Sequence, residues 1–363
     1  MRVGIGAIVG VTGGPATYAR ELVRALVMLG GDDRYVVFTD VPEAFASLDV
    51  ERVTVPLRFA WQQVTWDHVR LPALLRRTRV DLYHGTKNIL PWRCPVPAVV
   101  TVHDLAVYAM PETFAWPQRL HFRSCVPPSV RRAVRVIVDS SHARNDVVAR
   151  LGVDPAQIAV VPLGVGAEHW QEPGAEALCA LRRRYGLGER VVACAGTIQP
   201  RKRVEHAIEA FVRSGAVRRG WQLAIAGRLR PGYRPPWLRA LPVGVHWLGA
   251  LSAPELRALY SLAAIAVHAS EYEGFGLVLL EAMAAGCAVV AVRATSIPEV
   301  VSDAGLLVER SDPALLATAL AELLADETKR RTLGQRARAR ARGFTWEATA
   351  RRTHAVYAEV ARR

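Results

Sequence analysis

Short apolar runs and amphipathic helical stretches alternate along the whole chain, and this alternation limits the fold more than any other feature. The helix predicted over 16–29, for example, separates the apolar runs Val3–Val9 and Tyr35–Phe38. Such a rhythm is typical of βαβ units, whose parallel strands form a sheet with helices on both faces. It starts afresh at Val191–Ala195, so the sequence predicts an α/β protein with two doubly wound, Rossmann-like domains. The other predicted strands are Ala98–Val102, Val134–Val138, Gln222–Ala226, Ala264–His268 and Ala288–Val292, and the other predicted helices are Val204–Arg213, Pro254–Leu262 and Gly276–Ala285.

A stretch rich in Pro and Gly, Val160–Gly166, divides the two halves. We place the boundary near residue 167, which gives domains of residues 1–167 and 168–344, each long enough to bury its own core. The final stretch, Thr345–Arg363, is predicted to be a helix that packs back on the first domain. Ligands of open α/β sheets bind outside the carboxyl ends of the strands. We therefore expect the two domains to face each other across an interdomain cleft that holds the site.

Composition narrows the class of protein and its partners. Five scattered cysteines without CxxC spacing argue against a disulfide framework or a zinc site. No run of 18 uncharged apolar residues is present, and the first residues enter a strand rather than a signal-peptide pattern. We therefore expect a cytoplasmic protein. The formal net charge is +14, and 44 of the 47 basic residues are arginines. This charge favours anionic partners, with an anionic small molecule first and a peripheral contact with the inner face of a membrane as a further expectation.

A glycine-containing turn, Gly13-Gly14, opens the first predicted helix. Glycine lets a ligand approach the backbone closely, and the helix start offers N–H groups and a positive dipole end to a phosphate. A tight turn without any ligand is an equally good interpretation. The spacing of Gly4, Gly6 and Gly10 misses the GxGxxG dinucleotide pattern by one residue.

Two cations, Arg201 and Lys202, follow the first strand of the second half and precede a helix. Cations at the carboxyl end of a strand, beside a helix N-terminus, form a site for a diphosphate without a metal. A solvated cluster of charges is the alternative. The alternating Arg and Ala residues of 336–342 are expected to be such a solvated helix face.

Two glutamates, Glu273 and Glu281, flank a predicted loop and the apolar helix that follows it. Glu281 falls inside a buried helix, where a carboxylate is unfavourable unless it accepts hydrogen bonds. It is therefore either paired with an internal partner or reserved for ligand hydroxyls, and Glu273 could hold a second part of the same ligand.

His103 follows the strand that ends at Val102, again at a carboxyl end. A hydrogen-bonded structural histidine is the alternative to a functional one. No DxD sequence and no cluster with metal-ligand spacing occurs, so the sequence disfavours a metal-dependent mechanism.

Taken together, these elements resemble the retaining glycosyltransferases of family four, which have the GT-B fold and use a nucleotide sugar. The resemblance covers almost the whole chain. It rests on Gly13-Gly14, Thr101–Leu105 with Met110–Glu112, Asp139–Arg144, Val160–Val165, Gly196–Lys202, Glu273 with Glu281, and Ser296–Val300.

The resemblance implies a role for each matching side chain. Glu281 would bind the ribose of the nucleotide, and Glu273 would bind hydroxyls of the donor sugar. Arg201 and Lys202 would neutralise the departing diphosphate. His103 would contact the donor sugar near the reacting carbon.

One position departs from the family pattern. Many members have an arginine where this chain has Thr197, so the phosphate charge must fall on the other cations, with Arg228 as a further candidate. The backbone N–H of Gly14 would bind the same phosphates. The residues expected to form the donor site are Gly13, Gly14, Arg201, Lys202, Arg228, Leu251, Gly274, Phe275, Gly276, Leu277 and Glu281.

The activity implied by this resemblance is transfer of a hexose with retention at its anomeric carbon, without a metal or other cofactor. GDP-mannose is the first expectation for the donor, with UDP-, ADP- and dTDP-sugars as alternatives. A diphosphate oxygen would take the proton of the acceptor hydroxyl. The acceptor, a glycan, a lipid-linked molecule or a small molecule, should meet the first domain, where 59–66 and 108–116 place aromatic residues that are equally well explained as core.

The sequence suggests three other interpretations of function. Asp40, at the end of the second strand, could be the ribose-binding acid of an NAD-dependent oxidoreductase with tandem Rossmann domains. The net charge could indicate a nucleic-acid-binding protein, but no recognition element combines basic and aromatic residues, so we expect no nucleic-acid partner. A GT-B epimerase or phosphorylase would share Glu273, Glu281 and His103.

Overall fold

The computed structural model of the protein describes residues 1–11, 13–56 and 61–362. The chain divides into two compact units. The first unit is Met1–Gly164 together with Thr345–Arg363, and the second is Val165–Phe344. The last helix of the chain, α14 (Trp346–Ala361), therefore belongs to the first unit.

The first unit is built on a seven-stranded sheet whose neighbouring strands are all parallel. Its strand order is β3-β2-β1-β4-β5-β6-β7. The strands are β1 (Arg2–Ala7), β2 (Arg34–Thr39), β3 (Glu51–Thr54), β4 (Leu82–Gly85), β5 (Ala98–Val102), β6 (Arg135–Val138) and β7 (Ile158–Val160). The helices besides α14 are α1 (Gly14–Met28), α2 (Trp61–Thr65), α3 (Leu71–Arg77), α4 (Ala106–Ala109), α5 (Trp116–Arg132) and α6 (Ser141–Leu151), with a π-helical turn over Trp66–Arg70.

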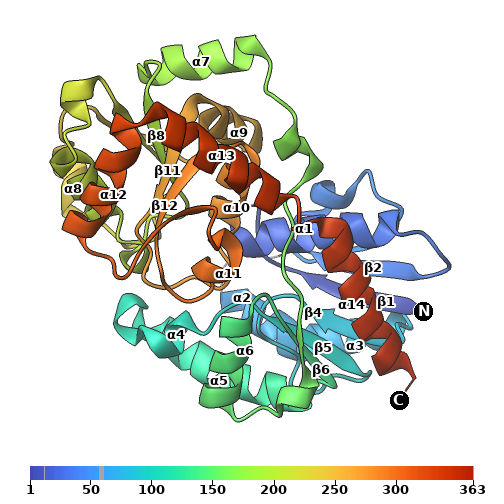
Figure 1. Ribbon diagram of the computed structural model, residues 1–363. Helices are drawn as coiled ribbons and strands as arrows, with labels where there is room; N and C mark the ends of the chain where they lie inside the picture. The colour runs from blue at the N-terminus through green and yellow to red at the C-terminus, as the bar shows by residue number, and fades with distance from the viewer. Residues whose placement is uncertain (12, 57–60, 363) are drawn as a thin grey trace. The chain divides into compact units, whose positions relative to one another are not determined.

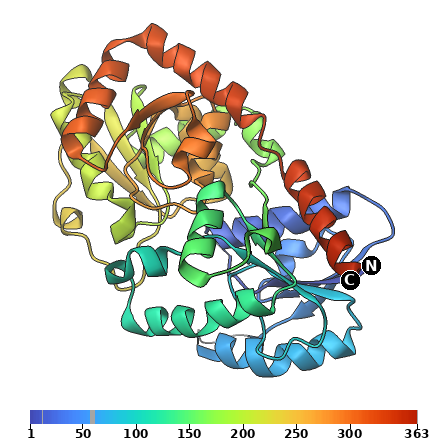
Figure 2. The same ribbon diagram turned by 60° about the horizontal axis from the view of Figure 1, so that its bottom comes forward.

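The return of the chain to the first unit depends on one glycine. At Gly164 a side chain would place its first carbon 2.1 Å from the backbone nitrogen of Trp346, so only glycine fits beside the start of α14. The helix then runs beside α1, and both ends of the chain lie close together (Figures 1 and 2). Asp33 joins them, because it binds the Met1 ammonium at 2.6 Å and His354 of α14 at 2.7 Å.

The second unit is a six-stranded parallel sheet in the order β10-β9-β8-β11-β12-β13. Its strands are β8 (Val191–Ala195), β9 (Gln222–Ala226), β10 (Val245–Gly249), β11 (Ala263–His268), β12 (Ala288–Val292) and β13 (Gly305–Val308). Its helices are α7 (Ala175–Tyr185), α8 (Val204–Arg213), α9 (Ala253–Leu262), α10 (Leu277–Ala284), α11 (Ile297–Val301), α12 (Pro313–Ala325) and α13 (Glu327–Ala341). Strand β12 is buried along its whole length, as expected of a parallel strand with helices on both faces.

Both sheets confirm the prediction of two doubly wound, Rossmann-like α/β folds. In each sheet the order of the strands reverses direction at one place, between β1 and β4 in the first unit and between β8 and β11 in the second. These topological switch points are where open α/β sheets bind ligands, at the carboxyl ends of the strands.

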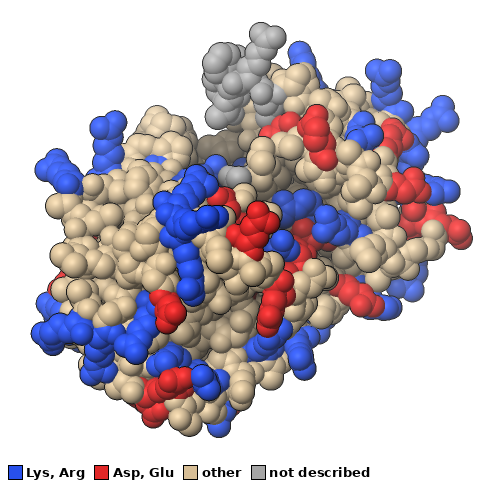
Figure 3. All heavy atoms as spheres, turned by 90° about the horizontal axis from the view of Figure 1, so that it is seen from above, with Lys and Arg blue, Asp and Glu red and all other residues tan. Residues whose placement is uncertain are grey.

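The Arg-rich helix α13 differs in part from the solvated face that the sequence predicts. Arg338 donates to the carbonyl of Trp170, and Arg340 donates to the carbonyls of Glu299 and Val300. Half of this basic run therefore stabilises the second unit. On the face drawn in Figure 3, Lys and Arg side chains are scattered, with Asp and Glu side chains between them.

Candidate functional site

A cluster of charges lies at the switch point of the second unit. Glu273, in the loop after β11, is 6% exposed, and Lys202 donates to its Oε1. His268, the last residue of β11, meets the same oxygen at 2.8 Å, and Arg201 Nη1 lies 3.5 Å from Oε2. The structure thus brings three of the predicted site residues together, with His268 as a fourth member that the sequence analysis missed.

The charge states within this cluster follow from burial and from its cations. Burial alone would raise the pKa of Glu273, but the charges of Lys202 and Arg201 hold it well below the usual value. Burial lowers the pKa of His268, so the neutral ring donates its Nε2–H to Glu273. The cluster therefore holds one anion and two cations in fixed positions.

The loop that carries Glu273 is tied down through its backbone. The N–H of Glu273 donates to Thr295 Oγ1 at 2.9 Å, and its carbonyl accepts from Thr295 at 2.8 Å and from Ser296 at 2.9 Å. The N–H of Glu271 donates to the carbonyl of Arg201 at 3.0 Å. These bonds fix the backbone of Glu273 and the backbone of Arg201. The carboxylate and its cations therefore need little rearrangement to act on a ligand.

Helix α10 starts at the end of this loop and carries the second glutamate. Gly276 precedes α10 with φ +106°, a conformation that favours glycine. Glu281 is half-buried on the helix and lies near Tyr260 of α9. Burial and the charge of Glu281 raise the pKa of Tyr260 well above its usual value. Tyr260 is thus an internal neighbour of Glu281, which is one of the two alternatives that the sequence predicted for this carboxylate.

The other residues predicted for the donor site surround this loop or the strand ends beside it. Gly274, Phe275 and Leu277 lie between the two glutamates, and Phe275 is buried with its ring 5.8 Å from that of Phe344. Thr197 follows β8, Arg228 is exposed just after β9, and Leu251 follows β10 and packs partly buried on the core.

The predicted residue His103 lies in the first unit, just after β5. Its Nδ1 is 2.7 Å from Asp139 Oδ2, and its Nε2 is 2.8 Å from the carbonyl of Thr86. Both partners are hydrogen-bond acceptors, so the doubly protonated ring satisfies both contacts whereas a neutral ring has only one N–H. Burial alone would lower the pKa of His103, but the charge and hydrogen bond of Asp139 raise it overall. Asp139 is not among the site residues predicted from the sequence, although its place directly after β6 is the signal that could have identified it.

Gly13 and Gly14 mark the start of α1 in the same unit. Gly13 has φ +101°, and Gly14 is exposed as the first residue of the helix. Asp40 accepts hydrogen bonds from the backbone N–H groups of Val9 and Gly10 at 3.1–3.3 Å, so it fixes the loop before α1. This contact gives Asp40 a structural role, in place of the ribose-binding role that an oxidoreductase would require.

A buried chain of hydrogen bonds lies behind His103. Tyr18 of α1 bonds Thr101 at 2.9 Å, Thr101 bonds His84 Nε2 at 2.7 Å, and His84 Nδ1 bonds Tyr357 of α14 at 2.6 Å. Burial lowers the pKa of His84 to about 3, so this ring is neutral. The ring of Tyr18 meets His103 edge-on, with centroids 4.6 Å apart. The C-terminal helix is thus connected through side chains to the surroundings of His103.

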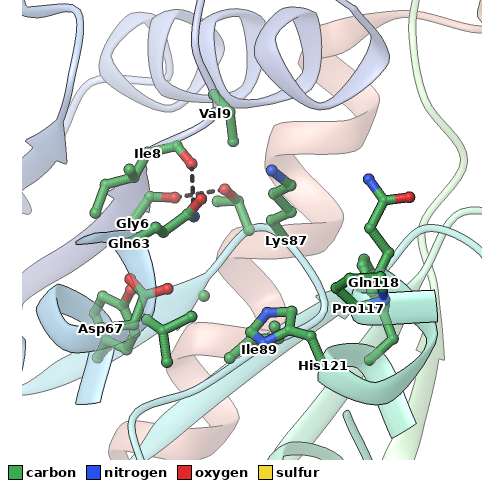
Figure 4. A pocket seen from close by; sticks show the side chains of 15 residues that line it. Gly6, Ile8, Val9, Gln63, Asp67, Lys87, Ile89, Pro117, Gln118 and His121 are labelled. Atoms are coloured by element: carbon green, nitrogen blue, oxygen red, sulfur yellow. Dashed lines mark hydrogen bonds between the residues drawn. The ribbon is translucent and has the colours of Figure 1, made fainter. Parts of the chain in front are cut away.

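A pocket of about 340 Å³ lies at the switch point of the first unit. Figure 4 shows Gln63, Asp67, Lys87 and His121 around it. Burial raises the pKa of Asp67 to about 7, and burial lowers the pKa of Lys87 and of His121. The pocket is lined by Gly6, Ile8, Val9, Gln63, Val64, Asp67, Tyr83, Gly85, Thr86, Lys87, Ile89, Pro117, Gln118, His121 and Phe122.

The aromatic residues expected near the acceptor divide between the core and the surface. Phe59 and Ala60 lie outside the described residues. Trp66 is buried against Phe38, with ring centroids 6.3 Å apart, so it belongs to the core. Trp116 is 65% exposed. Gln63 and Val64 of the first predicted stretch line the pocket, together with side chains that the sequence did not predict, such as Asp67, Lys87 and Phe122.

In the part of the chain that the structure describes, no three His, Cys, Asp or Glu side chains gather in a way that could hold a metal ion. None of its helices combines the length and the apolar character needed to cross a membrane.

Comparison with known proteins identifies relatives over both units. The family described as glycosyl transferases group 1 matches residues 181–340, and the family described as glycosyltransferase family 4 matches residues 12–169. An O-antigen chain mannosyltransferase B of Escherichia coli is 28% identical over 83% of this chain and 77% of its own length. A D-inositol 3-phosphate glycosyltransferase of Corynebacterium glutamicum (strain R) is 31% identical over 73% of this chain and 67% of its own length.

A solved structure shares the whole architecture. The Anabaena protein HepE, crystallised with UDP and glucose, matches 99% of this chain and 100% of its own chain with a TM-score of 0.79. The two are 19% identical, so this likeness concerns the fold, which is that of the GT-B glycosyltransferases. The chain is thus a glycosyltransferase and belongs to family 4, the group 1 glycosyl transferases.

Proposed function

We propose that the protein is a metal-independent retaining glycosyltransferase that transfers a hexose from a nucleotide sugar, with GDP-mannose as the first candidate. The observation that carries this proposal is the pair of cations, Arg201 and Lys202, held in place by Glu273 at the switch point of the second unit. In this proposal the second unit supplies the cations and the carboxylates that bind the donor, and the first unit binds the acceptor.

The cations act on the leaving group. Breaking the bond between the sugar and the nucleotide leaves negative charge on the diphosphate. Groups that are already in place where charge develops stabilise the transition state more than the ground state. Arg201 and Lys202 are 13% and 11% exposed, so their charges are poorly screened by water. They would supply the neutralisation that a metal supplies elsewhere.

The carboxylates hold the rest of the donor. Glu273 is kept ionised by its cations and can accept hydrogen bonds from sugar hydroxyls. Glu281, on the next helix, is assigned to the ribose. The N–H of Gly14 is assigned to the diphosphate, and His103, as a cation paired with Asp139, to the sugar near the reacting carbon. The acceptor proton passes to a diphosphate oxygen.

The pocket of the first unit is the proposed acceptor site. Its volume is at the small end of ligand pockets, roughly 300–1,000 Å³. It combines apolar walls, such as Ile8 and Phe122, with the amides of Gln63 and Gln118 and the charge of Lys87. Such a mixture suits a sugar or polyol, which presents hydroxyls at its edge and C–H groups on its faces.

Donor identity is decided by ligand-induced stabilisation. The purified protein in excess EDTA is heated with GDP, UDP, ADP, dTDP, NAD or a short DNA duplex. A ligand at 100 times its dissociation constant stabilises the fold by about 2.7 kcal/mol, and the melting temperature rises by several degrees. The name of the Escherichia coli relative supports mannose, so we expect GDP to give the largest shift. Glu281→Ala should abolish it.

A shift with NAD or DNA alone would contradict the proposal. Incubation with the matching nucleotide sugar then tests the reaction itself. Transfer with retention yields an α-linked product from GDP-mannose, and the NMR signal of the anomeric proton of that product reports the linkage. An inverted product, or an epimerised or phosphorolysed donor without transfer, would exclude retaining transfer.

A further inference from the structure

The ring of Tyr18 lies against the ring of His103, and no step of the proposed mechanism uses it. The two ring centroids are 4.6 Å apart, and the ring planes meet at 82°. Aromatic rings favour such an edge-to-face contact. Tyr18 is 1% exposed, so its side chain does not reach a substrate. An effect of Tyr18 on transfer therefore passes through a neighbour, and His103 is the neighbour that the proposed function uses.

Two hydrogen bonds hold the His103 ring but leave one rotation open. Asp139 Oδ2 accepts from Nδ1 at 2.7 Å, and the carbonyl of Thr86 accepts from Nε2 at 2.8 Å. Two points of contact define an axis through the two nitrogens, and the ring can still tilt about that axis. The ring of Tyr18 stands nearly perpendicular to the imidazole and blocks the tilt. It thus supplies the third support, which fixes the plane of the imidazole.

The Tyr18 ring is held in turn by buried hydrogen bonds. Its hydroxyl bonds Thr101 Oγ1 at 2.9 Å, and the same oxygen meets His84 Nε2 at 2.7 Å. Tyr357 bonds the other ring nitrogen of His84 at 2.6 Å. Because burial lowers the pKa of His84 to about 3, its neutral ring offers one N–H and one lone pair, as a link between two hydroxyls requires. Thr101 and His84 are fully buried, so water does not compete for these bonds.

We propose that Tyr18 is a positioning residue for His103: its ring, anchored through Thr101, keeps the imidazole in the orientation that acts on the donor sugar. The effect on the reaction rests on the proposed function of His103, whereas the support of the ring does not. The alternative is a purely structural contact, which would stabilise the first unit without any influence on His103. Kinetics separates the two roles, because a displacement of about 1 Å at a reacting centre lowers rates about a hundredfold.

Steady-state kinetics at saturating acceptor, with radiolabelled donor to follow slow variants, measures this effect. Tyr18→Leu removes the ring, so kcat should fall about thirtyfold. The KM for the donor should change less than about threefold, because no contact with the donor is removed. Tyr18→Phe keeps the ring and loses only the hydroxyl, so its kcat should fall about threefold.

Thr101→Val provides a second variant that is less exposed to failure of folding. It is nearly isosteric and removes the anchor of Tyr18 while the ring stays in place. Its kcat should fall about as far as that of Tyr18→Phe. A wild-type kcat in Thr101→Val, together with a wild-type kcat in Tyr18→Leu where that variant folds, would overturn the proposal.

A double-mutant cycle shows whether Tyr18 acts through His103. In the background of His103→Ala, Tyr18→Leu should lower kcat by no more than about twofold, because the group that Tyr18 positions is already gone. A second loss of about thirtyfold in the double variant would mean that Tyr18 acts by another route, and the proposal would be wrong.

NMR of the His103 ring tests the support without any reaction. In protein with isotope-labelled histidine, the doubly protonated ring should give two ring N–H signals, which His103→Ala identifies by removing them. Tyr18→Leu should shift or broaden these signals as the ring gains motion, and Tyr18→Phe should keep them close to the wild type. Unchanged signals in Tyr18→Leu would show a purely structural contact. If the wild type transfers no hexose, the proposed function fails, and these signals still decide whether Tyr18 holds the ring.

Matched controls remove similar groups elsewhere in the first unit. Phe45→Leu removes a buried ring. Thr353→Val removes a buried hydroxyl of α14 that has no hydrogen-bond partner among the described residues. Both controls should keep the kcat and the His103 signals of the wild type, whatever their melting temperature. Losses of kcat in the controls equal to those in Tyr18→Leu and Thr101→Val would mean a general loss of structure and would contradict positioning.

Discussion

The two switch points differ although their sheets have the same doubly wound parallel order. At the second, a buried carboxylate, two cations and a neutral histidine fill the space between the strand ends. At the first, an open pocket lies near a histidine and aspartate pair. The fold sets the place where a ligand binds, and the loops that follow the strands set the chemistry of that place.

The largest effect is expected when a cation is removed from the second switch point. Lys202→Ala should lower the turnover of the glycosyltransferase about 10²–10³-fold, the usual loss for one donor of transition-state stabilisation. Single-turnover rates at saturating donor measure this effect. Lys329→Ala, which removes an exposed lysine paired with Glu322, is the matched control and should be neutral. An unchanged rate in Lys202→Ala would contradict the proposed role of Lys202 in stabilising the departing diphosphate.

Glu273→Gln tests the electrostatics of the same cluster. It leaves two poorly solvated cations without their anion, so the free energy of unfolding should fall by about 3 kcal/mol at neutral pH. Because the folded-state pKa of Glu273 is depressed, its stabilisation is present above the unfolded value of about 4.3 and is lost as the pH falls through the folded value. Denaturant titrations at several pH values should show the difference from wild type narrowing in acid. Glu309→Gln, in an exposed pair with Arg293, should change little at any pH.

Asp139→Asn tests the first unit with the opposite pH dependence. The raised pKa of His103 means that the stabilisation by this pair is present below about pH 6.5 and is lost as the pH rises through the folded-state value. The free energy of unfolding should fall by about 2 kcal/mol at pH 6 and by less at pH 9. Asp49→Asn, at a side chain that is 93% exposed, serves as the control. A difference that grows with pH would mean that His103 is neutral.

Tyr357→Phe should give the smallest effect. It removes the hydroxyl that bonds His84 and leaves a buried ring nitrogen without this partner, which costs about 1–2 kcal/mol. The melting temperature should fall by a few degrees, independently of pH between 6 and 9, because His84 stays neutral throughout. Tyr185→Phe on α7 is the matched control. An equal loss in both variants would show that the buried hydrogen bonds between Tyr18 and Tyr357 contribute nothing specific to stability.

The sequence predicted the architecture well because apolar periodicity and parallel-sheet topology are local and repetitive properties. Arg201, Lys202 and Glu273 could be placed near one another because they follow strands that meet at one edge of the second sheet. His268 was missed since it ends an apolar strand and looks like part of the core. The pairing of His103 with Asp139 and the lining of the pocket depend on side chains from distant segments, whose directions no local pattern specifies.

The discontinuous first unit also constrains how the protein folds during its synthesis. Tyr357, His354 and the rest of α14 complete that unit, but 180 residues of the second unit are made between Gly164 and Thr345. At roughly 5–20 residues per second, the ribosome needs about ten to forty seconds for this stretch. During that time His84 lacks its tyrosine partner and the first sheet lacks one covering helix. The second unit can therefore finish folding before α14 completes the first unit.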